Sequence, residues 1–157
     1  MLQYHQMRKF LSIIISAALI TLFCCSLAAA YMASVKTEGT KLYLTPEIDE
    51  MAEIFDFPAN YPLKVIETRG EWSRVADYLK LKGWVQTSAL SSERMLIVTR
   101  AKVMLRAGPG TGNAIVTKLY QGQILKYVGC RKSWYKVKVV DPPDGGDGWV
   151  KRTLVWG

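Results

Sequence analysis

The sequence predicts an all-β fold of two small five-stranded β-barrels in tandem, preceded by an N-terminal apolar helix. Three observations lead to this fold class. One pattern of aromatic, glycine and aliphatic residues occurs twice, short β-branched segments alternate with turns, and a long apolar run opens the chain. The total of 157 residues suits either one ordinary domain or two very small ones.

The repeat consists of a Lys-x-x-Leu element, then Trp-x-x-Val, then Gly-Trp-Val. Its copies occupy residues 41–44, 72–75 and 83–85, and again 102–105, 134–137 and 148–150. The offsets are 61 residues from Leu44 to Leu105, 62 from Trp72 to Trp134 and 65 from Trp84 to Trp149. Offsets that change so little indicate a duplicated domain with insertions in its loops.

The N-terminal segment, residues 1–30, has the three parts of an export signal. A polar start with Arg8 and Lys9 precedes an apolar run over 10–27, and three alanines follow at 28–30. The apolar run is long enough to span a bilayer, so cleaved signal peptide and retained membrane anchor both stay open. In either case the chain after residue 30 is expected outside the cytoplasmic membrane.

The first copy is expected over residues 38–91, after a lead-in at 31–37. Alternating or β-branched residues predict strands at 40–44, 63–67, 72–78 and 83–86, followed by one helical turn at 87–90. Residues 91–93 are the whole linker. The repeats are therefore expected to lie close together.

The second copy is expected over residues 95–157. Its predicted strands are 101–106, 115–120, 123–128 and 134–139, and turn-forming residues mark loops at 107–113 and 141–147. A segment of about 55 residues closes most economically as a five-stranded barrel, which removes exposed sheet edges.

The second copy resembles the bacterial SH3-like (SH3b) domain over roughly residues 95–155. The resemblance rests on Val-Met-Leu-Arg-Ala-Gly-Pro-Gly at 103–110, on Gly122, on Trp-Tyr-Lys-Val at 134–137 and on Gly-Trp-Val at 148–150. The first copy resembles the family more weakly and has Thr-Pro-Glu at 45–47 in place of Arg-x-Gly-Pro. The resemblance implies extracytoplasmic barrel modules of wall hydrolases and envelope proteins, commonly inferred to bind peptidoglycan. It does not imply catalysis.

Charge separates the two copies. The chain carries a formal +8, but residues 31–92 hold seven basic and nine acidic residues, a net −2, whereas 93–157 hold twelve and four, a net +8. Basic and aromatic side chains of the second copy are the candidate ligand contacts, because cations attract anionic polymers and rings stack. The candidates are Arg106, Tyr127, Arg131, Lys132, Trp134 and Tyr135. The competing interpretations are a solvated basic face and, for Trp134, a cap on the core.

Several kinds of site are excluded by composition. The only histidine is His5, in the N-terminal segment, so the exported part has no histidine for a nucleophilic or zinc site. Cys130 is the one cysteine after residue 30 and is expected to be buried and inert. The glycine-rich stretch 108–113 precedes no helix and lacks the Gly-Lys-Ser/Thr ending of a phosphate loop. We therefore expect no catalytic residues, no metal and no cofactor.

The sequence thus predicts a non-catalytic binding protein, either periplasmic or on the cell surface, and either free or tethered to the cytoplasmic membrane. Its expected partner is peptidoglycan, another anionic cell-wall polymer or an envelope protein, and no nucleic acid is expected. The alternative is a structural or protein-interaction module of the envelope with no wall ligand.

Overall fold

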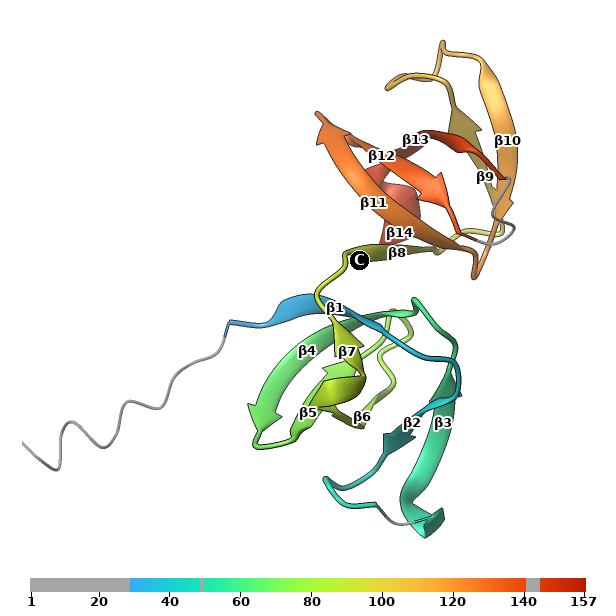
Figure 1. Ribbon diagram of the computed structural model, residues 1–157. Coiled ribbons are helices and arrows are strands. Elements are labelled where there is room, and N and C mark those ends of the chain that lie inside the picture. Colours follow the sequence, from blue (N-terminus) through green and yellow to red (C-terminus); the bar gives the residue numbers. More distant parts are fainter. Residues whose placement is uncertain (1–28, 49, 141–144) are drawn as a thin grey trace, which may run out of the picture.

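The computed structural model describes residues 29–48, 50–140 and 145–157, which form two antiparallel sheets of seven strands each (Figure 1). The first unit contains β1 (Tyr31–Val35), β2 (Thr40–Tyr43), η1 (Glu50–Ala52), β3 (Glu53–Phe57), β4 (Pro62–Arg69), β5 (Trp72–Ala76), β6 (Lys82–Gln86), η2 (Thr87–Ala89) and β7 (Leu90–Ser91). The second contains β8 (Met95–Val98), β9 (Lys102–Arg106), β10 (Ile115–Tyr120), β11 (Ile124–Arg131), β12 (Trp134–Val139), β13 (Asp147–Lys151), η3 (Arg152–Leu154) and β14 (Val155–Trp156).

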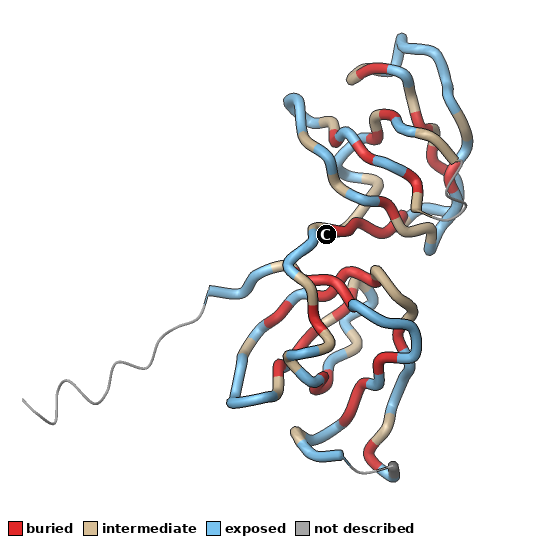
Figure 2. Tube along the Cα trace, viewed as in Figure 1, coloured by how far each residue is buried: buried red, intermediate tan, exposed pale blue. Residues whose placement is uncertain are grey.

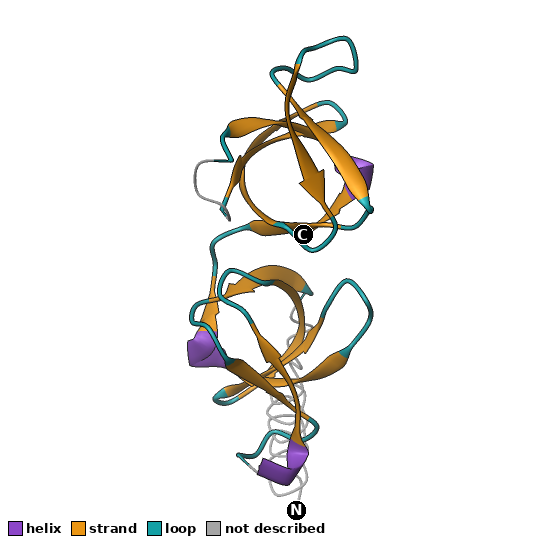
Figure 3. Ribbon diagram, turned by 90° about the vertical axis from the view of Figure 1, so that its right-hand side faces the viewer, coloured by secondary structure: helices purple, strands orange, loops and turns teal. Residues whose placement is uncertain are grey.

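The all-β class is confirmed, with 3-10 turns as the only helical elements in the described ranges. Each sheet curls around its own core (Figure 3). The expected N-terminal apolar helix lies outside the described residues. Within the described part of the chain, no helix is long and apolar enough to span a bilayer.

The two sheets have the same strand order. It is β3-β2-β6-β5-β4-β1-β7 in the first unit and β10-β9-β13-β12-β11-β8-β14 in the second, so each strand corresponds to the one seven places later. Each sheet has two strands more than the five we expected. The short β7 is one of the two in the first sheet and the short β14 one of the two in the second, where they pair with β1 and β8 respectively.

Individual backbone hydrogen bonds repeat as well. The N–H of Asn60 donates to the carbonyl of Val35, and the N–H of Gly122 donates to the carbonyl of Val98, both at 2.9 Å. Asn60 and Gly122 both have positive φ, 65° and 88°. A β-bulge interrupts β4 and β11 at corresponding places. The duplication therefore extends to the backbone geometry of single turns.

The structure corrects the register of the repeat at β2 and β9. Leu42 and Leu105 are both fully buried, whereas Leu44 is 64% exposed, so Leu44 is not the counterpart of Leu105. A Cβ on Gly83 would lie 2.7 Å from Leu42 Cγ, and one on Gly148 would lie 2.6 Å from Leu105 Cγ. The Lys-x-x-Leu match was therefore wrong by two residues, and the correct offset is 63.

Strand β1 was not expected. Its residues were predicted as a lead-in at 31–37, but β1 pairs with β4 and β7, and Ala33 and Val35 are buried. The first sheet thus begins at Tyr31, before the expected boundary at residue 38. Strand β3, an edge strand paired only with β2, was also missed.

Strand β8 connects the two cores. All four of its residues are buried: Leu96 and Val98 belong to the core of the second unit, and Ile97 packs into that of the first. Ile124 and Trp156 also pack against the first core. Figure 2 shows this buried segment where the two units meet. The contact between the units is therefore mainly apolar.

Candidate functional site: a basic cleft in the second unit

A cleft of about 370 Å³ opens between the β9–β10 loop and the β11–β12 turn. Its lining combines two cations, one indole ring and small polar groups. The lining residues are Pro109 and Asn113 from the loop and Arg131, Lys132, Ser133 and Trp134 from the turn. Three of the candidate residues, Arg131, Lys132 and Trp134, thus share one cavity.

The β11–β12 turn holds these side chains at the end of a hairpin. Arg131 pairs with Trp134 across the two strands, and Lys132 lies in the left-handed region with φ 53°. The corresponding residue of the first unit is Gly70, with φ 56°. A non-glycine residue in this region is strained, and such strain is often retained at binding sites.

The β9–β10 loop is braced by Asn113. The Nδ2 of Asn113 donates to the carbonyl of Gly110 at 3.2 Å, and the Arg106 guanidinium donates through Nη1 to the carbonyl of Asn113 at 2.8 Å. A Cβ on Gly108 would lie only 2.5 Å from Asn113 Oδ1. The glycine therefore lets the asparagine close the loop, and Arg106 fixes the wall of the cleft.

Arg106 also belongs to a mixed basic and aromatic row on the sheet. Trp149 pairs with Arg106 on β9 and with Lys136 on β12. Paired residues of neighbouring strands project from the same face. Positive charge therefore extends from the cleft across this face of the second unit.

Tyr127 and Tyr135 do not share the cleft, contrary to expectation. Tyr135 follows Trp134 on β12, so alternation turns it to the opposite face, where it is only 8% exposed. The rings of Tyr135 and Tyr127 meet edge-on, with 5.3 Å between their centroids. The Arg94 guanidinium lies over both, 5.2 Å from the Tyr135 centroid and 4.3 Å from that of Tyr127. These tyrosines therefore pack around Arg94, a residue that no sequence pattern had marked.

Cys130 is exposed, which corrects the expectation of a buried thiol. It lies near the phenol of Tyr127, and their hydrogen bond, together with desolvation, raises the pKa of Tyr127.

Three residues that line the basic cleft were not among the candidate residues: Pro109, Asn113 and Ser133. Their signal was the turn-rich composition of their loops, which predicts a loop but not which loops meet. Among the described residues, no three histidine, cysteine or acidic side chains are grouped as a metal site.

Comparison with known proteins relates the second unit to a family. Residues 102–155, from the start of β9 into β14, match the family model of the bacterial SH3 domain. This range includes every lining residue of the basic cleft. No curated protein matches the chain.

Solved structures with detectable similarity include NlpC1 and NlpC2 from Trichomonas vaginalis, with 12% and 13% identity and TM-scores of 0.37 and 0.36. Each match covers 84% of this chain, and 47% and 49% of those chains. An NlpC/P60 family protein from Bacillus cereus ATCC 10987 matches with 12% identity and a TM-score of 0.38, over 80% of this chain and 56% of that one. The chain thus spans about half the length of the solved structures it matches.

Proposed function

We propose that this chain is an exported pair of bacterial SH3-like modules that binds peptidoglycan or another anionic polymer of the cell envelope without catalysis. The single observation that carries the proposal is the basic cleft. Arg131, Lys132 and Trp134 gather there within the unit that matches the bacterial SH3 family.

The chemistry of the cleft suits an anionic ligand with an apolar part. Arg131 and Lys132 are exposed, and their charged donors form stronger hydrogen bonds to carboxylates than neutral donors do. Trp134 adds an apolar ring to the lining of the same cleft. Because the second unit carries a net +8, its field also draws polyanions toward the cleft.

The other parts of the proposal come from the sequence. The polar, apolar and alanine-rich pattern of residues 1–30 supports export or anchoring in the membrane. The absence of histidine after His5 supports a role in binding rather than turnover. In the cell envelope the available anions are stem-peptide carboxylates, anionic wall polymers and phospholipid head groups.

A pull-down with purified sacculi at physiological salt tests the proposal. The full chain is expected to be retained, and Arg131→Gln with Lys132→Gln is expected to weaken retention at least about tenfold, since two charge-assisted contacts are lost. Retention should also fall as salt is raised, because screening weakens exposed charges.

The matched control is Lys64→Gln with Lys82→Gln, which removes two exposed positive charges from the first unit. It should leave retention unchanged. Equal losses in the two double variants would show that total charge, not the cleft, governs binding. No retention of the full chain would overturn the proposal.

One observation favours the second candidate function, a protein-interaction module. The segment between β2 and β3 exposes apolar side chains of Leu44, Ile48 and Met51, at 64%, 72% and 93%. A cluster of exposed apolar residues is typical of protein contact surfaces. Under this alternative the Arg131 and Lys132 variant would behave as the full chain does.

A further inference from the structure

We propose that the first unit carries a second binding site, for an uncharged glycan, in the cleft formed by β2, the loop that follows it and η2. This inference goes beyond the binding of anions by the second unit and does not depend on it. It rests on the lining of the cleft, on the pairing of its one cation and on a comparison with the second unit.

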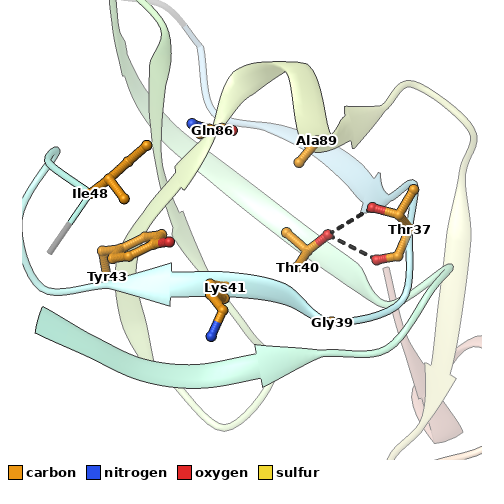
Figure 4. Close-up of a pocket in the computed structure, with 8 residues that line it drawn as sticks. All are labelled: Thr37, Gly39, Thr40, Lys41, Tyr43, Ile48, Gln86 and Ala89. Carbon is orange, nitrogen blue, oxygen red and sulfur yellow. Dashed lines mark hydrogen bonds between the residues drawn. The ribbon is translucent and has the colours of Figure 1, made fainter. Parts of the chain in front are cut away.

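The cleft has a volume of about 280 Å³, close to the lower end of ordinary ligand pockets, about 300 Å³. Figure 4 shows its walls: β2 and the turn before it on one side, and the end of β6 with η2 on the other. The lining residues are Thr37, Gly39, Thr40, Lys41, Tyr43, Ile48, Gln86 and Ala89.

Neutral hydrogen-bonding groups dominate the polar part of the cleft. The hydroxyl of Thr40 donates to the carbonyl of Thr37 at 2.8 Å and lies 3.3 Å from the Thr37 hydroxyl. The hydroxyl of Tyr43 lies on the same side, and the amide of Gln86 lies across from it (Figure 4). Hydroxyls and amides both donate and accept, as the hydroxyls of a sugar require.

The one cation of the lining is occupied elsewhere. Figure 4 shows the Lys41 side chain directed away from Gln86 and toward β3. There its Nζ bonds the Glu53 carboxylate at 2.5 Å and lies 3.9 Å from that of Asp56. The hydrogen bond to Glu53 raises the pKa of Lys41. Among the described residues that line this cleft, no charge is therefore left unpaired.

The apolar part of the cleft faces these groups. Ile48 is 72% exposed and lies beside the ring of Tyr43 (Figure 4), and Ala89 adds a methyl group. The Tyr43 ring is held by Trp72, whose ring meets it edge-on at 5.5 Å. A pyranose ring has the matching character, because its C–H face is apolar and its edge carries hydroxyls.

Two of the equivalent positions in the second unit are basic. Tyr43 pairs with the tryptophan of Gly-Trp-Val in the first unit, and Arg106 pairs with it in the second. Gln86 pairs with the tryptophan of Trp-x-x-Val in the first unit, and Lys151 pairs with it in the second. At these two positions of the shared scaffold, the neutral side chains are thus specific to the first unit. An uncharged ligand there explains the difference better than a second anion does.

The test uses the full chain in a zwitterionic detergent free of sugar, with a neutral tetrasaccharide of N-acetylglucosamine as the probe in calorimetric titration. Binding is expected, and Gln86→Lys or Tyr43→Arg should each weaken it about tenfold, since each removes a contact that the ligand uses. Both substitutions install the residue that the second unit carries at that place. The control Lys151→Gln in the second unit should leave the affinity for the sugar unchanged.

Gln86 is exposed, so Gln86→Lys preserves the fold and keeps the test valid if Tyr43→Arg unfolds the unit. No heat of binding at millimolar tetrasaccharide would overturn the inference, as would binding that Gln86→Lys leaves intact. Neither outcome touches the proposed function, which is judged by the difference in sacculus retention between the parent chain and the Arg131 and Lys132 variant.

Discussion

The two units of this chain share a backbone and differ in what they place on it. Strand order, turn hydrogen bonds, bulges and the contacts of Gly83 and Gly148 all repeat. The side chains around the clefts do not repeat, and the formal charge changes from −2 to +8. The shared strand pairing and a buried apolar core hold each sheet, so its surface can carry a different chemistry.

The largest expected effect tests the shared scaffold. Gly83→Ala and Gly148→Ala should each destabilise their own unit by about 3 kcal/mol or more, because the new Cβ would lie 2.7 or 2.8 Å from a backbone carbonyl oxygen. Urea denaturation monitored by tryptophan fluorescence would measure both. If one unit tolerated alanine, the two scaffolds would not be equivalent there.

The next effect concerns the boundary between the units. Trp156→Ala should cost about 2 kcal/mol, since the indole of Trp156 packs against the core of the first unit. It should also separate a single unfolding transition into two. Calorimetry on the full chain would detect this, and one unsplit transition would show that β8 alone couples the units.

A smaller effect distinguishes the units by pH. The hydroxyl of Tyr61 donates to the Asp77 carboxylate at 3.3 Å. Burial and the charge of this carboxylate raise the pKa of Tyr61. The stability gained from the protonated phenol is complete below the unfolded pKa of about 10 and is lost as pH rises above it. At pH 11 the free energy of unfolding of the first unit should be lower by about 1.4 kcal/mol. The second unit should show no matching loss, because Gln123 at the equivalent position does not titrate.

Tyr61→Phe should remove this loss of stability at high pH, because phenylalanine does not titrate. At pH 8 the variant should be about 1 kcal/mol less stable than the parent, because it lacks the hydrogen bond to Asp77. Denaturation curves of the variant and the parent at pH 8 and pH 11 measure both quantities. Identical pH dependence in the two proteins would mean that other groups cause the decline.

The smallest expected effect compares two turns of equal geometry. Lys132→Gly should stabilise the second unit by about 1 kcal/mol, and Gly70→Lys should destabilise the first by a similar amount, because only glycine adopts positive φ without strain. Lys132→Gly should also weaken retention on sacculi. Greater stability with undiminished binding would remove Lys132 from the proposed site.

The sequence predicted most of the architecture because the repeat is carried by residues that repeat for structural reasons. The tryptophans and the glycines that precede them lie at matching points of the two sheets, so their spacing was informative. Strand β8 was not predicted, because its two faces enter different cores and all its residues are apolar. It therefore lacks the alternation of apolar and polar residues that marks a half-buried strand. The two-residue error at Leu44 arose because Lys-x-x-Leu is a weak signal.

Sequence reasoning anticipated part of the grouping of side chains around the basic cleft, whose role stays a prediction. Arg131, Lys132 and Trp134 are close in sequence, and their turn brings them into one cleft. The grouping with Tyr127 and Tyr135 failed, because neighbouring residues of a strand face opposite sides. Pro109 and Asn113 come from a distant loop, and no local pattern states which loop a turn will meet.

The apolar junction around Ile97, Ile124 and Trp156 has a consequence for multivalent binding. Because it packs residues of the second unit against the first core, it favours one relative orientation of the units. Under the two proposals above, an envelope polymer with both neutral and anionic parts would therefore meet the two clefts at a set separation. Avidity then depends on whether that separation matches the period of the polymer, since a rigid pair of sites gains high effective concentration only for a ligand of the right spacing. If both proposals hold, the junction thus sets the ligand spacing at which the two clefts act together.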